Sequence, residues 1–149
     1  MDKFLIKGPC KIKGQVLISG SKNAALPILA STILFDKTVT IKNLPRVKDI
    51  DTMLKLLKSL GSKIQFFNNK KTVKIIKNKK QKIFVPYSLV KTMRAGILVL
   101  GPMIAKHQKS ITSLPGGCLI GARPVNYHLS ALKKFGMKYK IKKGYIYAN

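Results

Sequence analysis

The chain has 149 residues, of which 46% are hydrophobic, and this composition suits one globular domain rather than a disordered polypeptide. Its longest apolar run, residues 95–105, has 11 residues where a membrane-spanning helix needs roughly 20, so it predicts a buried helix. The first residues lack the apolar stretch of a secretory signal, and two cysteines do not make a disulfide framework. We therefore expect a cytoplasmic protein that does not enter a membrane.

Charge is the unusual property of this composition. Thirty basic residues face four acidic ones, and the net charge of +26 would ordinarily indicate a nucleic acid or another anionic partner. The basic residues are 27 lysines and three arginines spread over the whole chain, whereas a nucleic-acid footprint should cluster on one element. Abundant Lys, Asn and Ile are typical of an A/T-rich genome, so we favour codon bias over nucleic-acid binding. The remaining arginines, Arg46, Arg94 and Arg123, then indicate positions that need planar, two-pronged contacts.

The first half of the chain predicts alternating helices and strands. An apolar helix is expected over residues 24–35, followed by a strand near Ile41 and an amphipathic helix that ends before Gly61. Strands should follow this glycine, including one over residues 73–76. We also expect a strand before the first helix, with Cys10 buried as a small apolar side chain in an N-terminal strand.

The second half repeats this order. An apolar helix is expected over residues 89–106, then a strand near Ile111 and a helix that ends before Gly136. Gly136 lies 75 residues after its counterpart in the first unit, and Ile111 lies 70 residues after its own. Alternating strands and helices predict an α/β fold.

The change of offset marks an insertion in the second unit. Between Pro115 and Asn126 this unit is five residues longer, and the added loop contains several glycines, Cys118 and Arg123. Glycines allow close approach to a ligand, and a nearby arginine favours the reactive thiolate form of cysteine. A tolerated surface insertion is the alternative, but the accompanying cysteine and arginine favour a reactive loop.

Two helix starts are candidate binding positions. Pro27 is tolerated only near a helix start, which puts Lys22 and Asn23 at the N-terminus of the first helix. Free backbone N–H groups, the positive end of the helix dipole and a lysine together form an anion site, although Asn23 could serve only as an N-cap. Arg94 stands near the equivalent position of the second apolar helix, where a solvated surface arginine is the alternative. The two helix starts could therefore line one cleft.

Three stretches, residues 18–29, 86–95 and 113–125, resemble the UDP-N-acetylglucosamine 1-carboxyvinyltransferase family of the EPSP synthase superfamily. The similarity runs in order over essentially the whole chain. It implies an α/β fold made of repeated βαβαββ units in an inside-out barrel, with about two of the six units present. It also implies transfer of the enolpyruvyl group of phosphoenolpyruvate to the 3′-hydroxyl of UDP-N-acetylglucosamine with release of phosphate, the first committed step of peptidoglycan synthesis.

The resemblance also assigns roles to single residues. Cys118 matches the loop cysteine that acts as general acid toward the enolpyruvate carbon and is the target of fosfomycin. Lys22 and Asn23 match contacts to phosphoenolpyruvate. Contacts to UDP-N-acetylglucosamine are implied for Arg94, Arg123, Pro124, Val125, Asn126 and Tyr127. No metal or organic cofactor is implied.

Two departures from the family limit what this chain can do alone. Asn126 replaces an aspartate that is usual in the family, which removes a charge from the nucleotide site. The chain also supplies one partial domain, residues 1–149, with a first unit over about 20–85 and a second over about 86–149. Residues 1–19 correspond to strands that belong to the family's other domain. The family's general base lies in the absent units, so we expect the isolated chain to be inactive or nearly so.

Several alternatives stay open from the sequence. The chain could be part of a split enzyme that works with a second chain carrying the missing units, a degraded gene product, or a fragment of a longer protein. It could also be a noncatalytic remnant that binds a UDP-sugar. A basic nucleic-acid-binding module would need basic and aromatic side chains on one strand face. The candidate for such a face, residues 66–71, fits a strand and hairpin turn better.

Overall fold

The computed structural model describes residues 3–78, 81–116 and 124–149. The first unit contains helix α1 (Lys22–Ser31), the 3-10 helix η1 (Thr32–Leu34), strand β1 (Val39–Ile41), helix α2 (Lys48–Ser59), and strands β2 (Lys63–Phe67) and β3 (Thr72–Ile76). The second unit contains strand β4 (Phe84–Val85), helix α3 (Tyr87–Val90), the 3-10 helix η2 (Arg94–Val99), helix α4 (Leu100–His107), strand β5 (Ser110–Ser113), helix α5 (Asn126–Lys134), and strands β6 (Tyr139–Lys142) and β7 (Tyr145–Ala148).

Each unit forms its own sheet, and the two sheets share one strand order. The first sheet runs β1-β3-β2 with antiparallel pairs, and Ile41 lies opposite Val73. The second sheet repeats this arrangement as β5-β7-β6, with Ile111 opposite Tyr147, and β4 adds to β5 as a parallel strand. The predicted repeat and the α/β fold class are both confirmed. The sequence of residues 66–71 is confirmed as the end of a strand and a hairpin turn.

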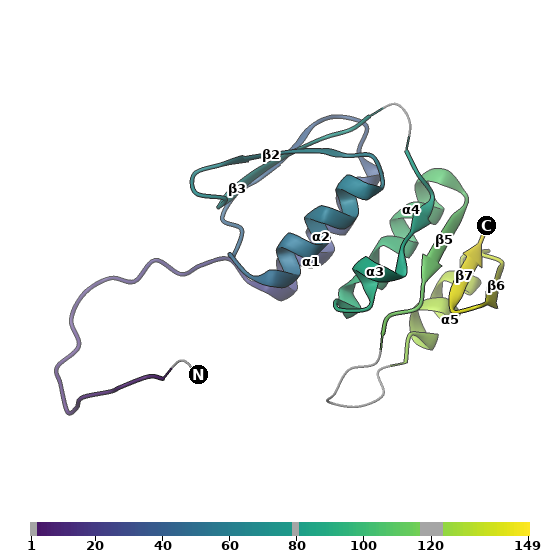
Figure 1. Cartoon of the computed structure of the whole chain (residues 1–149). Coiled ribbons are helices and arrows are strands. Elements are labelled where there is room, and N and C mark those ends of the chain that lie inside the picture. Colours follow the sequence, from purple (N-terminus) through teal and green to yellow (C-terminus); the bar gives the residue numbers. More distant parts are fainter. Residues whose placement is uncertain (1–2, 79–80, 117–123) are drawn as a thin grey trace.

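The strand expected before the first helix does not form in the described part of the chain. Residues 3–19 contain no strand and extend away from the folded body as a long arm (Figure 1). Apolar side chains of this arm, such as Phe4 at 98% and Ile12 at 94%, are almost fully exposed. Cys10 is exposed as well, which corrects the expectation that it is buried. The physical reason is that no layer of the described structure packs on this arm.

Helix α1 begins at Lys22, so Lys22 and Asn23 lie at its N-terminus as predicted. Its N-cap is Ser21 rather than Asn23, and the Ser21 hydroxyl oxygen accepts a hydrogen bond from the Ala24 amide at 3.4 Å. Pro27 lies in the second turn rather than the first. The apolar stretch expected to form one helix to residue 35 ends as a 3-10 turn, η1.

The second apolar stretch is divided into three helical pieces, α3, η2 and α4, where the sequence predicted one helix. A Cβ added at Gly96 in η2 would lie 3.0 Å from a methyl carbon of Val90, so this glycine allows η2 to pack closely on α3. Pro102 is tolerated because it falls in the first turn of α4, where backbone N–H groups have no helical partner. Among the helices within the described ranges, none has the length and apolar character that crossing a bilayer requires.

The core joins the two units. Figure 1 shows α1 and α2 side by side along one face of the first sheet, with α3 and α4 next to them. The larger cluster of buried side chains combines Leu29, Leu57 and Val73 of the first unit with Met103 of the second. A smaller cluster packs α5 against the second sheet around Ile146. Burial of each large side chain contributes about 1.5–3 kcal/mol, so the two units stabilise each other.

Candidate functional site

The N-terminus of α1 carries two of the predicted site residues. Lys22 and Asn23 are its first two residues, as the sequence predicted. The Lys22 side-chain amine donates a hydrogen bond to Oδ2 of Asp49 at 3.0 Å, and Asp49 stands in the first turn of α2. Because α1 packs against α2, this ion pair brings together the positive N-terminal ends of two helices. The arrangement concentrates positive charge, and Asp49 offsets part of it.

Asp49 is a residue that the sequence analysis did not assign to the site. Its signal was present, because two of the four acidic residues of the chain, Asp49 and Asp51, fall in the first turn of one helix. Carboxylates in a first turn stabilise a helix through its dipole, and this role does not indicate an ion pair with a lysine 27 positions away. Both side chains of the ion pair are partly exposed, at 47% for Lys22 and 34% for Asp49. The pair is therefore open to exchange with a dissolved anion.

Arg94 lies on an element that packs against α1. It is the first residue of η2 and is exposed to solvent. The direct contact between α1 and η2 places Lys22 and Arg94 on neighbouring elements. Arg94 precedes the main apolar helix rather than opening it, because the 3-10 segment intervenes before α4.

The base of the glycine-rich loop lies against the segment that leads to Arg94. A Cβ added at Gly116 would stand 2.6 Å from the carbonyl oxygen of Lys91, so only glycine fits this contact without movement. Lys91 follows α3 directly and is three residues before Arg94. The start of the loop is thus fixed beside the second helix start. Cys118 and Arg123 lie outside the described residues.

The far end of the loop leads into α5. Pro124 and Val125 precede this helix, Asn126 and Tyr127 are its first two residues, and Val125 occupies the N-cap position without a side-chain hydrogen bond. Tyr127 is 78% exposed. The Asn126 side chain is likewise exposed at the helix start, where the aspartate usual in the resembled family would add a negative charge.

A second group of ionisable side chains lies where the units meet. Lys106 of α4 forms an ion pair with Asp36, and the Lys77 amine donates to the Ile33 carbonyl oxygen at 2.7 Å. Burial, and then repulsion by Lys77 and Lys106, hold the pKa of His107 below its usual value. Burial also lowers the pKa of Lys77. The His107 atom Nε2 is buried without a hydrogen-bond partner in the described structure.

These groups connect the units rather than form a reaction centre. Asp36 and Lys106 are 70 positions apart, the same offset that relates Ile41 to Ile111. The ion pair therefore joins positions that are equivalent in the repeat, Lys106 in the last turn of α4 and Asp36 just after η1. Within residues 3–78, 81–116 and 124–149, no three His, Cys, Asp or Glu side chains gather in the way that metal ligands do.

The chain is similar to known proteins over its full length. The family model described as EPSP synthase (3-phosphoshikimate 1-carboxyvinyltransferase) matches residues 6–149. A UDP-N-acetylglucosamine 1-carboxyvinyltransferase of Pelagibacter ubique is 63% identical over 100% of this chain and 35% of its own length. Proteins of the same name from Hamiltonella defensa and Acinetobacter baylyi are 51% and 49% identical, again over 35% of their lengths. The chain thus spans about a third of the length of the curated relatives it matches.

Solved structures agree on the fold. The enolpyruvyl transferase NikO from Streptomyces tendae superposes with a TM-score of 0.74 at 15% identity, covering 88% of this chain and 28% of that one. An EPSP synthase from Acinetobacter baumannii gives a TM-score of 0.63 at 14% identity, over 90% of this chain and 31% of its own. The paired α/β units are therefore part of the fold that these larger proteins share.

Proposed function

Because the chain belongs to the EPSP synthase family, we propose that it forms the N-terminal third of a UDP-N-acetylglucosamine enolpyruvyl transferase. The observation that carries this proposal is 63% identity over the entire chain to a relative of that name. The proposed reaction moves the enolpyruvyl group of phosphoenolpyruvate to the 3′-hydroxyl of UDP-N-acetylglucosamine and releases phosphate. It would supply peptidoglycan synthesis in the cytoplasm, and through it cell shape and division.

Phosphoenolpyruvate is proposed to bind at the start of α1. Lys22 and Asn23 open this helix, and its free N–H groups suit a phosphate or carboxylate. Asp49 would hold the Lys22 amine in place before the substrate arrives. When a doubly charged phosphate enters, the lysine would exchange this carboxylate for the stronger anion.

The sugar nucleotide is proposed to bind along η2 and the start of α5. Arg94 is exposed on η2, and the segment from Arg123 through Pro124, Val125 and Asn126 to Tyr127 would grip UDP-N-acetylglucosamine. The exposed ring of Tyr127 is available for contact. The Asn126 side chain can accept and donate hydrogen bonds, but it lacks the charge of the usual aspartate.

Cys118 is the proposed general acid. A thiol can deliver its proton to the methylene carbon of phosphoenolpyruvate while the sugar hydroxyl attacks the neighbouring carbon and gives its own proton to a base in the missing units. Phosphate then leaves as the new methyl group loses one proton, which restores the carbon–carbon double bond of the enolpyruvyl product. Arg123, five residues away, would favour the thiolate that the transfer leaves behind. The same reactivity would make Cys118 the target of fosfomycin.

We further propose that activity requires the units that this chain does not contain. The relatives are about three times as long, and general acid–base catalysis needs both partners within reach. A second polypeptide or a continuation of this one would supply them. Residues 1–19 would pack on that missing part, which would cover their exposed apolar side chains.

The test is reconstitution. The 149-residue chain is mixed with a polypeptide covering the remaining two thirds of the Pelagibacter ubique relative, and phosphate release from phosphoenolpyruvate is followed with and without UDP-N-acetylglucosamine. We expect release only when both polypeptides and both substrates are present. Cys118→Ser should abolish most of this release, whereas Cys10→Ser should leave it unchanged. Equal turnover by the Cys118→Ser mixture would refute the assignment of the thiol.

A further inference from the structure

The outer face of the second sheet carries an ordered set of aromatic and basic side chains. One row crosses all four strands, because Phe84 lies opposite Ile111, Ile111 opposite Tyr147, and Tyr147 opposite Lys140. In the next row Tyr145 lies opposite Lys142. These residues face away from the core, since the alternate positions on β7, Ile146 and Ala148, are buried at 0% and 6% exposure.

The aromatic side chains on this face are exposed and partly held in place. Phe84 and Tyr147 are 46% and 44% exposed. The rings of Phe84 and Tyr145 stack with their centroids 5.5 Å apart, and the Tyr145 hydroxyl accepts a hydrogen bond from the Tyr87 amide at 3.4 Å. A flat ring that is already fixed loses little conformational freedom when another ring stacks on it.

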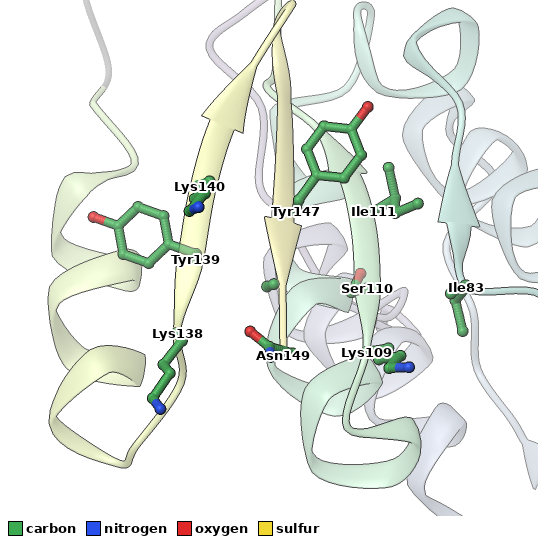
Figure 2. A pocket seen from close by; sticks show the side chains of 10 residues that line it. Ile83, Lys109, Ser110, Ile111, Lys138, Tyr139, Lys140, Tyr147 and Asn149 are labelled. Carbon is green, nitrogen blue, oxygen red and sulfur yellow. The ribbon is translucent and has the colours of Figure 1, made fainter.

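Lysines surround these rings. Lys140 and Lys142 stand beside the two tyrosines, and Lys109 and Lys138 extend from the neighbouring strand ends to line a hollow of about 500 Å³ (Figure 2). Figure 2 shows Tyr147 and Ile111 projecting from adjacent strands, with Lys140 on the strand beyond. The acidic side chains that the structure describes, Asp36, Asp49 and Asp51, all belong to the first unit rather than to this sheet.

We propose that this tyrosine–lysine face, formed by Phe84, Ile111, Tyr145 and Tyr147 with Lys109, Lys138, Lys140 and Lys142, binds single-stranded nucleic acid. Bases stack on the exposed rings and the lysine amines contact the phosphates. Codon bias accounts for how many lysines the chain has, but not for their alignment with aromatic residues on one sheet face. The candidate face at residues 66–71 has two adjacent phenylalanines, which point to opposite sides of a strand.

The charge and shape of the face select this occupant. An acidic protein partner would neutralise the lysines, but carboxylate side chains do not stack on the rings. An anionic membrane would use the charge, but the apolar side chains here lie on the strands of a sheet rather than along an amphipathic helix. A flexible strand of bases satisfies both the rings and the amines, and duplex DNA cannot, because its bases are already stacked on each other.

The test separates stacking from the general attraction of a chain of charge +26. Fluorescence anisotropy measures the Kd of the 149-residue chain for a labelled deoxythymidine oligomer of about 15 nucleotides, over the range of salt concentrations in which circular dichroism and sedimentation show a folded monomer. Tyr147→Ala should weaken binding about 5- to 150-fold, the range for one stacked base, with the salt dependence unchanged. Tyr147→Phe should retain binding. Lys140→Gln should reduce the slope of log Kd against log salt by about 0.7.

Matched controls decide the outcome. Phe135→Ala removes a ring that is 90% exposed at the end of α5, and unlike Tyr147→Ala it should leave the Kd unchanged. Lys55→Gln removes an exposed charge on α2, and unlike Lys140→Gln it should leave the slope of log Kd against log salt unchanged. Duplex DNA of the same length should bind without sensitivity to Tyr147→Ala. Equal losses in Phe135→Ala and Tyr147→Ala, or no loss in either, would overturn the proposal. Vesicles with anionic headgroups that bind the chain in a Tyr147-dependent way would also overturn it and assign the face to membranes.

Discussion

At the scale of single residues, the strength of the ion pair between Lys22 and Asp49 determines how readily the Lys22 amine can leave Asp49 to bind a substrate. Both side chains are partly exposed, and such pairs contribute about 0.2–1 kcal/mol because solvent screens them. We predict a coupling energy in this range from the double-mutant cycle of Lys22→Met and Asp49→Asn, measured by urea unfolding. A coupling above about 2 kcal/mol would mean that Lys22 serves the structure and is not available to a substrate.

The two cysteines give a second prediction at this scale. Cys10 is exposed, so burial does not protect its thiol from reagents. We nevertheless expect limiting iodoacetamide to label Cys118 faster, because a neighbouring arginine increases the reactive thiolate form. Mass spectrometry of the two peptides at a series of times measures the rates. Arg123→Gln should bring the two rates together, and faster labelling of Cys10 in the unchanged chain would contradict the assignment.

At the scale of elements, the entry into α1 depends on Gly20. A Cβ added there would stand 1.9 Å from the carbonyl oxygen of Asn43, which follows β1, so the chain must separate from β1 to accommodate it. Gly20→Ala should therefore destabilise the fold by about 1–3 kcal/mol in urea unfolding. The matched control is Gly101→Ala in α4, where the nearest atom is a Leu132 methyl carbon at 3.8 Å. This control should be neutral or stabilise by up to about 1 kcal/mol, since alanine is the better helix former.

The end of α4 makes stability depend on pH. Burial, Lys77 and Lys106 lower the pKa of His107 in the folded chain, so the unfolded chain binds its proton more readily. Stability should thus be constant above the unfolded pKa of about 6.5 and decrease as pH falls from there toward the lower folded pKa. His107→Gln should remove this decrease in thermal melts between about pH 7.5 and 5. The control His128→Gln, at an exposed position on α5, should keep the decrease in stability. A decrease that persists in His107→Gln would show that His107 is not its cause.

Asp36 contributes to the stability of the fold in a different pH range. The hydrogen bond from Lys106 and the charges of Lys106 and Lys77 hold the pKa of Asp36 below its usual value. Its contribution is present above the unfolded pKa and is lost only as pH falls through the acid range. The two effects are therefore separable in one pH series.

Helix ends could be predicted from the sequence because they depend on residues close together in the chain. Gly61 and Gly136 adopt φ of +107° and +96° just after α2 and α5, where the repeat placed helix ends. The two sheets share one strand order, as a repeat requires, but the order itself was not predicted from the sequence. The division of residues 89–106 into three pieces was missed, because it depends on the close packing of Gly96 on Val90 rather than on periodicity. Cys10 was misjudged because an apolar pattern shows only that a segment needs a partner layer, not that one is present.

The candidate site followed a similar rule. Lys22 and Asn23 were placed correctly at the start of α1, although Ser21 rather than Asn23 caps the helix and Pro27 lies in the second turn. Asp49 could not, since an ion pair across 27 positions depends on how two helices pack. The tyrosine–lysine face could not be predicted from the sequence for the same reason. Its members come from strands that are distant in sequence and meet only through the register of the second sheet.

At the scale of the whole molecule, net charge and exposed apolar surface oppose each other. A charge of +26 destabilises a compact chain of 149 residues through self-repulsion, and salt screens it over about 10 Å at 0.1 M. The shared core resists that repulsion, so both units should unfold together. The N-terminal arm exposes Phe4, Leu5 and Leu17 almost fully, and β1 forms one edge of its sheet. Such surfaces promote association once repulsion is screened.

We therefore predict marginal folding at low salt and self-association at high salt. Thermal melting and sedimentation of the 149-residue chain between about 0.02 and 1 M salt should show Tm rising first and larger species appearing later. Removal of residues 1–19 should suppress the larger species while leaving the rise in Tm, because the arm carries the exposed apolar side chains and little of the core. Addition of the polypeptide with the missing units should suppress association of the full chain as well. A monodisperse monomer with one sharp melt at every salt concentration would show instead that these two units form a complete domain, and the proposal of a missing part would fail with it.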